Sequence, residues 1–235
     1  MRLWPTKRQW NKWSLPSKYS AIGLLIALLS VPLIFIPFWS DTDKKLSKPK
    51  VPTRPTEVKL AKKLRQKCLL NLDKDQVSAM LREFDFYDQE LNTSGRGVVN
   101  EFESKTIYDG NVIVDLQTKL VWQRSGSGSN DSPDSKKEMT LREADEYIIQ
   151  LNKEKFAGFK DWHLPTLEET MTLMERFEQN GTEFHIDSLF SYDQMWIWTC
   201  DEENEDSSWI VVFLKETCMT FPIESQASVR AVRSS

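Results

Sequence analysis

An uncharged apolar run near the N-terminus constrains this chain more than any other feature. It extends from Ala21 to Trp39, nineteen residues without a charged side chain. At a rise of about 1.5 Å per residue, a helix of that length matches the hydrocarbon core of a bilayer. Pro32 is tolerated inside a spanning helix, and Pro37 lies near its end. The sequence therefore predicts a transmembrane anchor over residues 21–39.

The same run leaves a cleaved signal peptide as an alternative, because a basic stretch followed by an apolar one fits that too. However, the run is long and ends in Phe38-Trp39-Ser40-Asp41, without a small-residue cleavage site. Lysines and arginines are equally numerous on the two flanks, so the positive-inside rule does not choose an orientation. Residues 1–20 contain no acid, and we expect them to form a basic cytoplasmic N-terminus, with the rest of the chain outside the cytoplasm.

Charge is distributed unevenly along the chain. Residues 1–67 contain 15 Lys and Arg against three acids, whereas residues 68–235 contain 16 Lys and Arg against 32 acids. The second part has a net charge of about −16 and should repel DNA, RNA and sulfated glycans, so no nucleic-acid partner is expected. Residues 40–56 combine lysines with three prolines, a composition typical of an extended tether.

The three cysteines, Cys68, Cys200 and Cys218, are too few for a disulfide framework. Their spacing matches neither a zinc site nor a Cys-x-x-Cys redox pair. We expect free buried thiols, with a bridge between Cys200 and Cys218 across neighbouring strands as the alternative in an oxidising compartment.

Residues 57–97 are expected to form a short helical segment. Apolar residues recur at helical spacing from Val58 to Leu72 and again from Asp75 to Phe84. The acids around Asp73 suggest a calcium loop, but its glycine and glutamate positions hold Ser and Phe. Asp73 is instead expected to be the N-cap of a helix.

The remaining part, residues 98–235, has the pattern of an α+β domain. Two alternating segments, 111–115 and 119–124, flank a polar turn and predict a β-hairpin. Capping boxes at Thr140 and Thr166 predict the starts of two helices. The apolar residues expected on the second helix are Met171, Leu173, Met174 and Phe177.

Five sequence blocks follow one another in this domain. They are Gly110-x-Val112-x-Val114-Asp115-x-x-Thr118-x-Leu120-x-Trp122-Gln123, Leu151-Asn152, Phe156-Ala157-Gly158-Phe159-x-Asp161-Trp162-His163-Leu164-Pro165-Thr166-x-x-Glu169, Trp196-x-Trp198-Thr199 and Val229-Arg230-x-Val232-Arg233. Together they resemble the Legionella collagen-like (Lcl) protein C-terminal domain family, also called domain of unknown function 1566. His163 departs from the family pattern, which usually has Arg there.

The resemblance implies a C-type-lectin-like or formylglycine-generating-enzyme-like fold, with two helices on a small, twisted, mostly antiparallel sheet. It also implies an exported domain, which agrees with a single-pass anchor in a bacterial inner membrane. The motif residues expected to have a structural role are Asp115, Trp122, Asp161, Trp162, Pro165 and Trp198. Asp161 is suited to accept backbone amides in a tight turn, Trp162 to fill the interior, and Pro165 to enforce an extended residue before the second helix.

Candidate ligand residues lie around Trp196-Ile197-Trp198. Alternation places the two rings on one face of a strand; we expect Trp198 in the core and leave Trp196 open. The acidic run 201–206 is expected to be a solvated loop, with calcium binding as the alternative. The candidate ligand-binding residues are Trp196, Asp201, Glu203, Trp209 and Arg230. The alternative role for Arg230 is an ion pair with an acid of the sheet, and the same pairing is expected for Arg233.

The sequence assigns no catalytic group. Its two histidines, His163 and His185, lie in different segments, and no Cys-His or Ser-His-Asp pattern is evident. We therefore expect a non-catalytic, membrane-anchored binding module for a glycan or an envelope protein, with calcium as the one candidate cofactor. A structural subunit of an envelope complex is the first alternative, and an enzyme of the formylglycine-generating type is the second.

Overall fold

The computed structural model describes residues 63–128, 138–177, 183–190 and 194–235. The predicted cytoplasmic N-terminus (1–20), anchor (21–39) and tether (40–56) lie outside the described residues. Within the described ranges, no helix is both long enough and apolar enough to cross a membrane.

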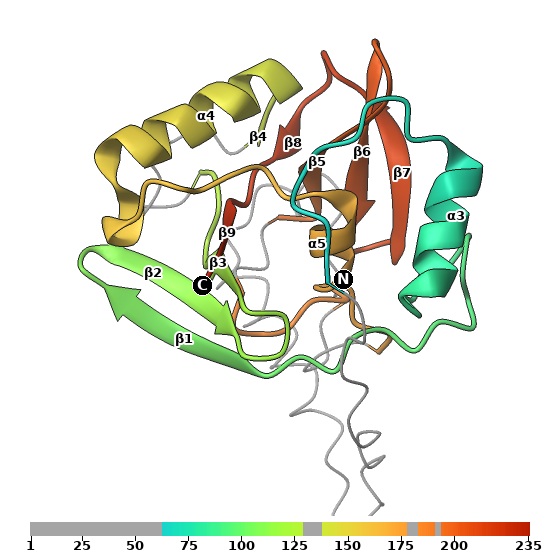
Figure 1. The fold of residues 1–235 in the computed structure, drawn as a ribbon, viewed down its shortest axis with the longest axis horizontal. Helices are drawn as coiled ribbons and strands as arrows, with labels where there is room; N and C mark the ends of the chain where they lie inside the picture. The colour runs from blue at the N-terminus through green and yellow to red at the C-terminus, as the bar shows by residue number, and fades with distance from the viewer. Residues whose placement is uncertain (1–62, 129–137, 178–182, 191–193) are drawn as a thin grey trace, which may run out of the picture. The chain divides into compact units, whose positions relative to one another are not determined.

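In the described part of the chain, nine strands form two sheets (Figure 1). The first sheet is antiparallel and contains, in order, β1 (Phe102–Ile107), β2 (Gly110–Asp115), β3 (Leu120–Gln123) and β9 (Val232–Ser234). The second contains β4 (Glu138–Met139), β8 (Ala227–Ser228), β5 (Trp196–Asn204), β6 (Ser207–Val212) and β7 (Thr217–Pro222), and only its β5–β8 pair is parallel. The predicted hairpin is confirmed as β2 and β3.

Helices in the described ranges begin where the sequence places them. They are α3 (Lys74–Glu83), α4 (Leu141–Glu154) and α5 (Leu167–Met171), with a short 3-10 turn, η1 (Phe156–Gly158). Asp73, Thr140 and Thr166 are the three N-caps, and each forms a complete capping box with the residue three positions later. The domain is therefore α+β, as predicted, but it contains two sheets instead of one.

Two helical predictions are wrong. The helix at Thr166 ends at Met171, because the next amides bond three residues back and Glu175 N then donates to the carbonyl of His185 at 2.9 Å. The helix predicted from Val58 to Leu72 is absent over residues 63–72, and its first five residues lie outside the described part of the chain. Residues 63–72 run along β5, where Leu72 N donates to Glu202 O at 2.8 Å and Glu202 N donates to Leu69 O at 2.9 Å.

The core consists of two hydrophobic clusters, one on each face of the sheets. Neighbouring residues on a strand point to opposite faces, and Ile197 and Trp198 accordingly belong to different clusters. Helices α3 and α5 contribute Val77, Leu81 and Leu167 to the first cluster, and α4 packs on the second. Because both faces are covered, β3 and most of β6 are buried along their length.

The motif residues mostly have the structural roles expected of them. Trp122 and Trp198 are fully buried, and the indole of Trp162 donates to Phe156 O at 3.0 Å. Asp115 closes the turn after β2 by accepting from Gln117 N at 2.9 Å and from the hydroxyl of Thr118 at 2.6 Å.

Asp161 and Pro165 make contacts that the local sequence does not show. Arg233 Nε donates to Asp161 Oδ1 at 2.8 Å, so Arg233 does pair with an acid, but this acid lies in the loop before α5 and not in the sheet as predicted. This bond lowers the pKa of Asp161. The carbonyl of Pro165 accepts from Cys200 N at 2.9 Å and so ties the start of α5 to β5.

Tyr87 connects the end of α3 to the turn before β7, and its ionisation provides a test of this packing. Its hydroxyl lies 2.7 Å from Glu216 Oε2, and burial together with that carboxylate raises the pKa of Tyr87 to about 12. The neutral phenol therefore stabilises the fold fully below pH 10, and this contribution is lost as the pH rises towards 12.

Replacing Glu216 with Gln should lower the pKa of Tyr87, but not to 10, because burial remains. The titration is followed by NMR of ¹³C-labelled tyrosine rings, with Tyr87→Phe to assign the signal. An unchanged pKa in Glu216→Gln would show that the carboxylate has no influence on the phenol.

Candidate functional site

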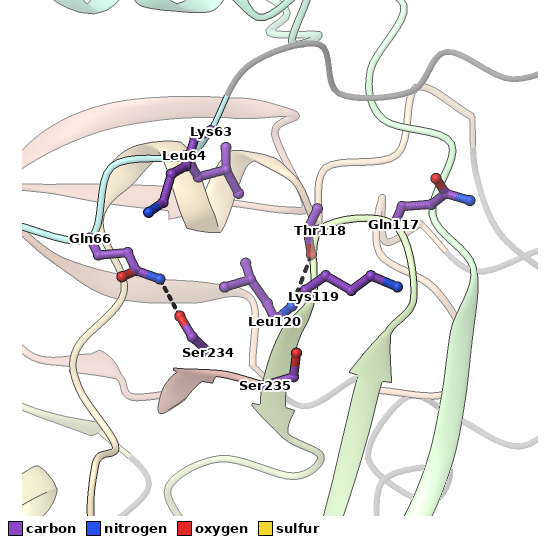
Figure 2. Close-up of a pocket in the computed structure, with 9 residues that line it drawn as sticks. All are labelled: Lys63, Leu64, Gln66, Gln117, Thr118, Lys119, Leu120, Ser234 and Ser235. Atoms are coloured by element: carbon purple, nitrogen blue, oxygen red, sulfur yellow. Dashed lines mark hydrogen bonds between the residues drawn. The ribbon is translucent and has the colours of Figure 1, made fainter.

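A cavity of about 340 Å³ opens beside the start of β3 (Figure 2). Its lining comprises Lys63, Leu64, Gln66, Gln117, Thr118, Lys119, Leu120, Ser234 and Ser235. Three separate parts of the chain thus form its walls: the segment 63–66, the turn between β2 and β3, and the end of β9. Its volume is within the range of cavities that bind small molecules.

The lining combines an apolar base with a polar rim. The side chains of Leu64 and Leu120 are buried, whereas amides, hydroxyls and lysines surround them. Gln66 Nε2 donates to the hydroxyl of Ser234 and so connects the first wall to the third. Among the described residues, no aspartate or glutamate side chain lines the cavity, which distinguishes it from the acidic domain as a whole. Such a lining suits a ring with an apolar face and hydroxyl edges.

A second hollow of about 410 Å³ lies on the other side of Gln117, which lines both. Its remaining lining residues are Val99, Asn100, Glu101, Phe102, Asp187 and Leu189. The described residues of this lining include two acids and no hydroxyl side chain, whereas Thr118, Ser234 and Ser235 bring hydroxyl groups to the first cavity.

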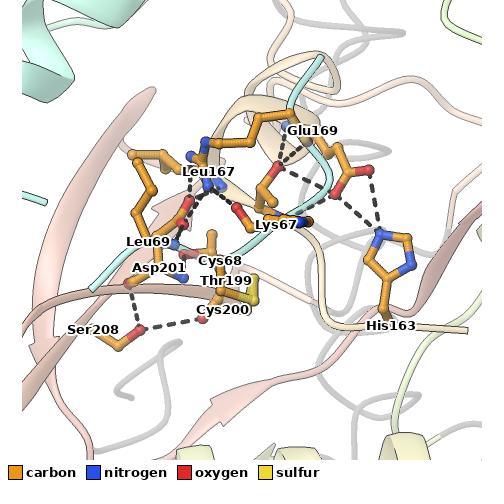
Figure 3. Close-up of a disulfide and its surroundings, with 12 residues drawn as sticks. Lys67, Cys68, Leu69, His163, Leu167, Glu169, Thr199, Cys200, Asp201 and Ser208 are labelled. Carbon is orange, nitrogen blue, oxygen red and sulfur yellow. Dashed lines mark hydrogen bonds and ion pairs between the residues drawn. A yellow bond between two sulfur atoms is a disulfide. The ribbon is translucent and has the colours of Figure 1, made fainter.

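A disulfide holds the first wall of the 340 Å³ cavity in place (Figure 3). Cys68 is bonded to Cys200 of β5, across 132 positions of sequence. Both expectations for the cysteines are therefore wrong for this pair. Cys218 cannot reach Cys200 because it lies on β7, opposite Val211, and β6 separates the two strands. Cys218 is the buried free thiol, and burial raises its pKa well above the ordinary value.

Asp201 is the centre of the contacts beside the disulfide. Its side chain is completely buried and receives both Nη atoms of Arg65, at 2.7 and 2.8 Å. The backbone amides of Leu69 and Leu167 each donate to it at 2.7 Å. Partial burial lowers the pKa of Arg65, but the bonds and charges of Asp201 and Glu168 outweigh it and raise that pKa overall.

Glu169 is a second buried carboxylate in this region. It belongs to the capping box of α5 and accepts from Thr166 N at 2.9 Å. His163 Nε2 lies 3.3 Å from both of its carboxylate oxygens. The histidine at a position where the family usually has Arg thus still contacts an acid.

The structure does not bring the predicted ligand residues together on one surface. Trp209 is 2% exposed and its indole donates to Leu72 O at 2.8 Å. Arg230 is fully buried; its Nη1 donates to Gln123 O at 2.9 Å, and its guanidinium lies 4.9 Å from the centre of the Phe190 ring. Asp201 is an interior residue as well. These three side chains therefore support the fold.

The expected acidic loop is mostly a strand. Residues 201–204 continue β5, and the chain turns only at 205–206. Glu203 accepts from the Ser207 hydroxyl at 3.1 Å, within the same hairpin. Trp196 is half-buried, and the rings of Trp196 and Trp198 pack on the same cluster, as alternation predicts. The described residues contain no group of three or more His, Cys, Asp or Glu that could hold a metal ion.

Comparison with known protein families assigns residues 111–233 to the Lcl C-terminal domain, slightly more than half of the chain. The chain belongs to the Lcl C-terminal domain family. This confirms the resemblance carried by the sequence blocks. A comparison with curated proteins found none that matches. The part of the chain matched to the Lcl C-terminal domain supplies the β2–β3 turn of the cavity and Leu120 at the start of β3. The other lining residues, Lys63, Leu64, Gln66, Ser234 and Ser235, lie outside the match.

Sequence reasoning missed those outer lining residues. Lys63, Gln66 and Ser234 are isolated polar residues near the ends of the domain, in no recognisable motif. Cys68 was the sequence signal for these residues. Had it been paired with a cysteine of the domain, residues 63–67 would have been placed against the domain.

Proposed function

We propose that this chain is a non-catalytic binding module, anchored in a bacterial inner membrane by residues 21–39 and holding its Lcl C-terminal domain outside the cytoplasm. The observation that carries the proposal is the 340 Å³ cavity, whose wall a disulfide attaches to the domain. Disulfides persist in oxidising compartments and are rare in the cytoplasm. A C-type-lectin-like fold is the finer assignment that we propose for the two sheets and their helices.

The ligand proposed for the cavity is a neutral or amino sugar at the end of a glycan. Leu64 and Leu120 provide apolar contact for one face of a sugar ring, and the amides and hydroxyls of the rim suit its hydroxyl groups. Long-range repulsion disfavours a sulfated glycan, because residues 68–235 have a net charge of about −16, even though Lys63 and Lys119 line the cavity.

A glycan array probed with the full-length chain in detergent, with and without calcium, tests this ligand. The Gln66→Leu variant removes a rim donor and should weaken binding to a neutral or amino sugar about tenfold. Glu203→Gln, which changes a half-buried polar residue away from the cavity, is the matched control and should bind normally. Binding to no sugar in either condition, or equal binding by both variants, would contradict the glycan proposal.

The location is tested separately through the thiols. Cells are quenched with acid, free thiols are alkylated, and the chain is analysed by mass spectrometry. We expect Cys68 and Cys200 to be found bonded to each other, and a protease added to spheroplasts to digest the domain. Free Cys68 and Cys200 thiols in quenched cells, together with protection from the protease, would place the domain in the cytoplasm.

A further inference from the structure

Residues 63–72 form a strap across the second sheet, outside the part matched to the family. The far end of this strap is firmly held. Leu72 is 6% exposed, its amide donates to Glu202, and its carbonyl accepts from the indole of Trp209. The near end, by contrast, contains the lining residues Lys63, Leu64 and Gln66. The near end can therefore move away from the cavity and remove part of its lining, while the far end keeps the following helix α3 in place.

Arg65 makes most of the polar contacts of the near end, in addition to the bond from Gln66 to Ser234 and the packing of Leu64 in the first core cluster. Its amide and Nε both donate to Glu168, at 2.7 and 3.2 Å, and its Nη atoms donate to Asp201. Its carbonyl accepts from the hydroxyl of Thr166 at 3.1 Å. The side chains of Arg65 and Glu168 are 19% and 12% exposed, so water reaches the ion pair between them, whereas Asp201 is completely buried. Ion pairs that water reaches are weak compared with a covalent bond.

The disulfide that reinforces these contacts is accessible from solvent. Cys68 is exposed and Cys200 is half-buried, whereas the free Cys218 is only 3% exposed. The residues after Cys68 are open as well, with Leu70 67% exposed. A thiolate can therefore approach the sulfur of Cys68 without unfolding the domain.

We propose that the Cys68–Cys200 disulfide is a redox latch: its reduction by a dithiol frees residues 63–69 and removes one wall of the cavity. The proposal rests on the cavity being the binding site proposed above, and it adds the regulation of that site. The reductant is identified by its chemistry, as a small dithiol or a protein with two neighbouring thiols.

Reduction proceeds by two exchange steps. A thiolate of the dithiol attacks Sγ of Cys68; a new S–S bond forms there, and the Cys68–Cys200 bond breaks with its electron pair on Sγ of Cys200. The second thiolate then attacks the reductant's own sulfur in the mixed disulfide, and Cys68 leaves as a thiolate. Both cysteine thiolates take up protons. The dithiol has lost two electrons and two protons to become a cyclic disulfide.

Hydrogen exchange of the full-length chain in detergent micelles tests the latch without any glycan. The reporters are the amides of Arg65 and Leu69, which donate to Glu168 and Asp201. Treatment with dithiothreitol should accelerate their exchange at least about tenfold and leave α4 unchanged. The double variant Cys68→Ser/Cys200→Ser should show the same amide exchange rates without treatment as the reduced protein. Dithiothreitol should not change the exchange rates of this variant. Iodoacetamide added after reduction should label Cys68 and Cys200 but not Cys218.

Three outcomes would overturn the latch. One is unchanged exchange at Arg65 and Leu69 after complete reduction, which would show that the ion pairs suffice to hold the strap. Another is equal acceleration in α4, which would show that the disulfide stabilises the whole domain and not the strap. The third is resistance of the disulfide to dithiothreitol in the folded protein. None of these readouts involves sugar binding, so the latch and the glycan proposal fail independently.

Discussion

The Asp201→Ala variant should have a free energy of unfolding lower by about 3–5 kcal/mol than that of the unmodified chain. The carboxylate is fully buried and accepts from Arg65 and from two backbone amides. Its removal leaves the amides of Leu69 and Leu167 without their acceptor and Arg65 without its buried partner. An unsatisfied buried donor, such as the amide of Leu167, costs about 1–3 kcal/mol, whereas the amide of Leu69 lies nearer the surface and contributes less.

Urea denaturation followed by tryptophan fluorescence measures this change. Glu203→Ala is the matched control, because Glu203 lies on the same strand but is only half-buried and contacts the neighbouring hairpin strand. We expect that control to change stability by less than about 0.5 kcal/mol. Similar losses in the two variants would show that Asp201 is not the centre of this cluster.

The Trp198→Ala variant should destabilise the domain by about 3–5 kcal/mol, because it empties a large volume of the second core cluster. Trp198 is fully buried, its indole donates to Met139 O at 2.7 Å, and its ring centre lies 5.8 Å from that of Phe221. The substitution removes these contacts and leaves the carbonyl of Met139 without this donor.

Trp196→Ala is the control for Trp198→Ala, since both rings lie on one face of β5. Trp196 is half-buried, and its indole nitrogen has no hydrogen-bond partner among the described residues. The loss of stability in this variant should be less than half of that in Trp198→Ala. Thermal unfolding followed by circular dichroism compares the two, and a larger loss in Trp196→Ala would contradict the assignment of Trp198 to the core.

Local sequence was sufficient for features that depend on neighbouring residues. A capping box joins residues three positions apart, so Asp73, Thr140 and Thr166 could be recognised as helix starts without any tertiary information. The alternation of β2 and β3, on either side of a short turn, likewise predicted the hairpin. The spacing of apolar residues predicted a longer α5 than the structure has. The helix ends early because Glu175 bonds to His185, and this tertiary contact redirects the chain.

The candidate site depended on contacts that no local pattern reveals. Local composition described 201–206 as an acidic, solvated loop, yet Asp201 is buried because Arg65, 136 positions away, neutralises it. In the same way Cys200 bonds to Cys68 and not to the nearer Cys218, because an intervening strand separates Cys200 from Cys218. Burial and pairing are set by which segments become neighbours, and sequence separation gives little information about that.

The sequence by itself determined the family, the α+β class, the hairpin, the helix starts and the interior position of Trp198. All of these follow from residues within a few positions of one another or from ordered motif blocks. Only the tertiary structure decided the partner of Asp201, the pairing of Cys68 and the cavity between the strap, the β2–β3 turn and β9. Those features join segments that are distant in the sequence: Asp201 and Cys200 have partners 136 and 132 positions away, and the cavity brings residues 63–66 to Ser234 and Ser235.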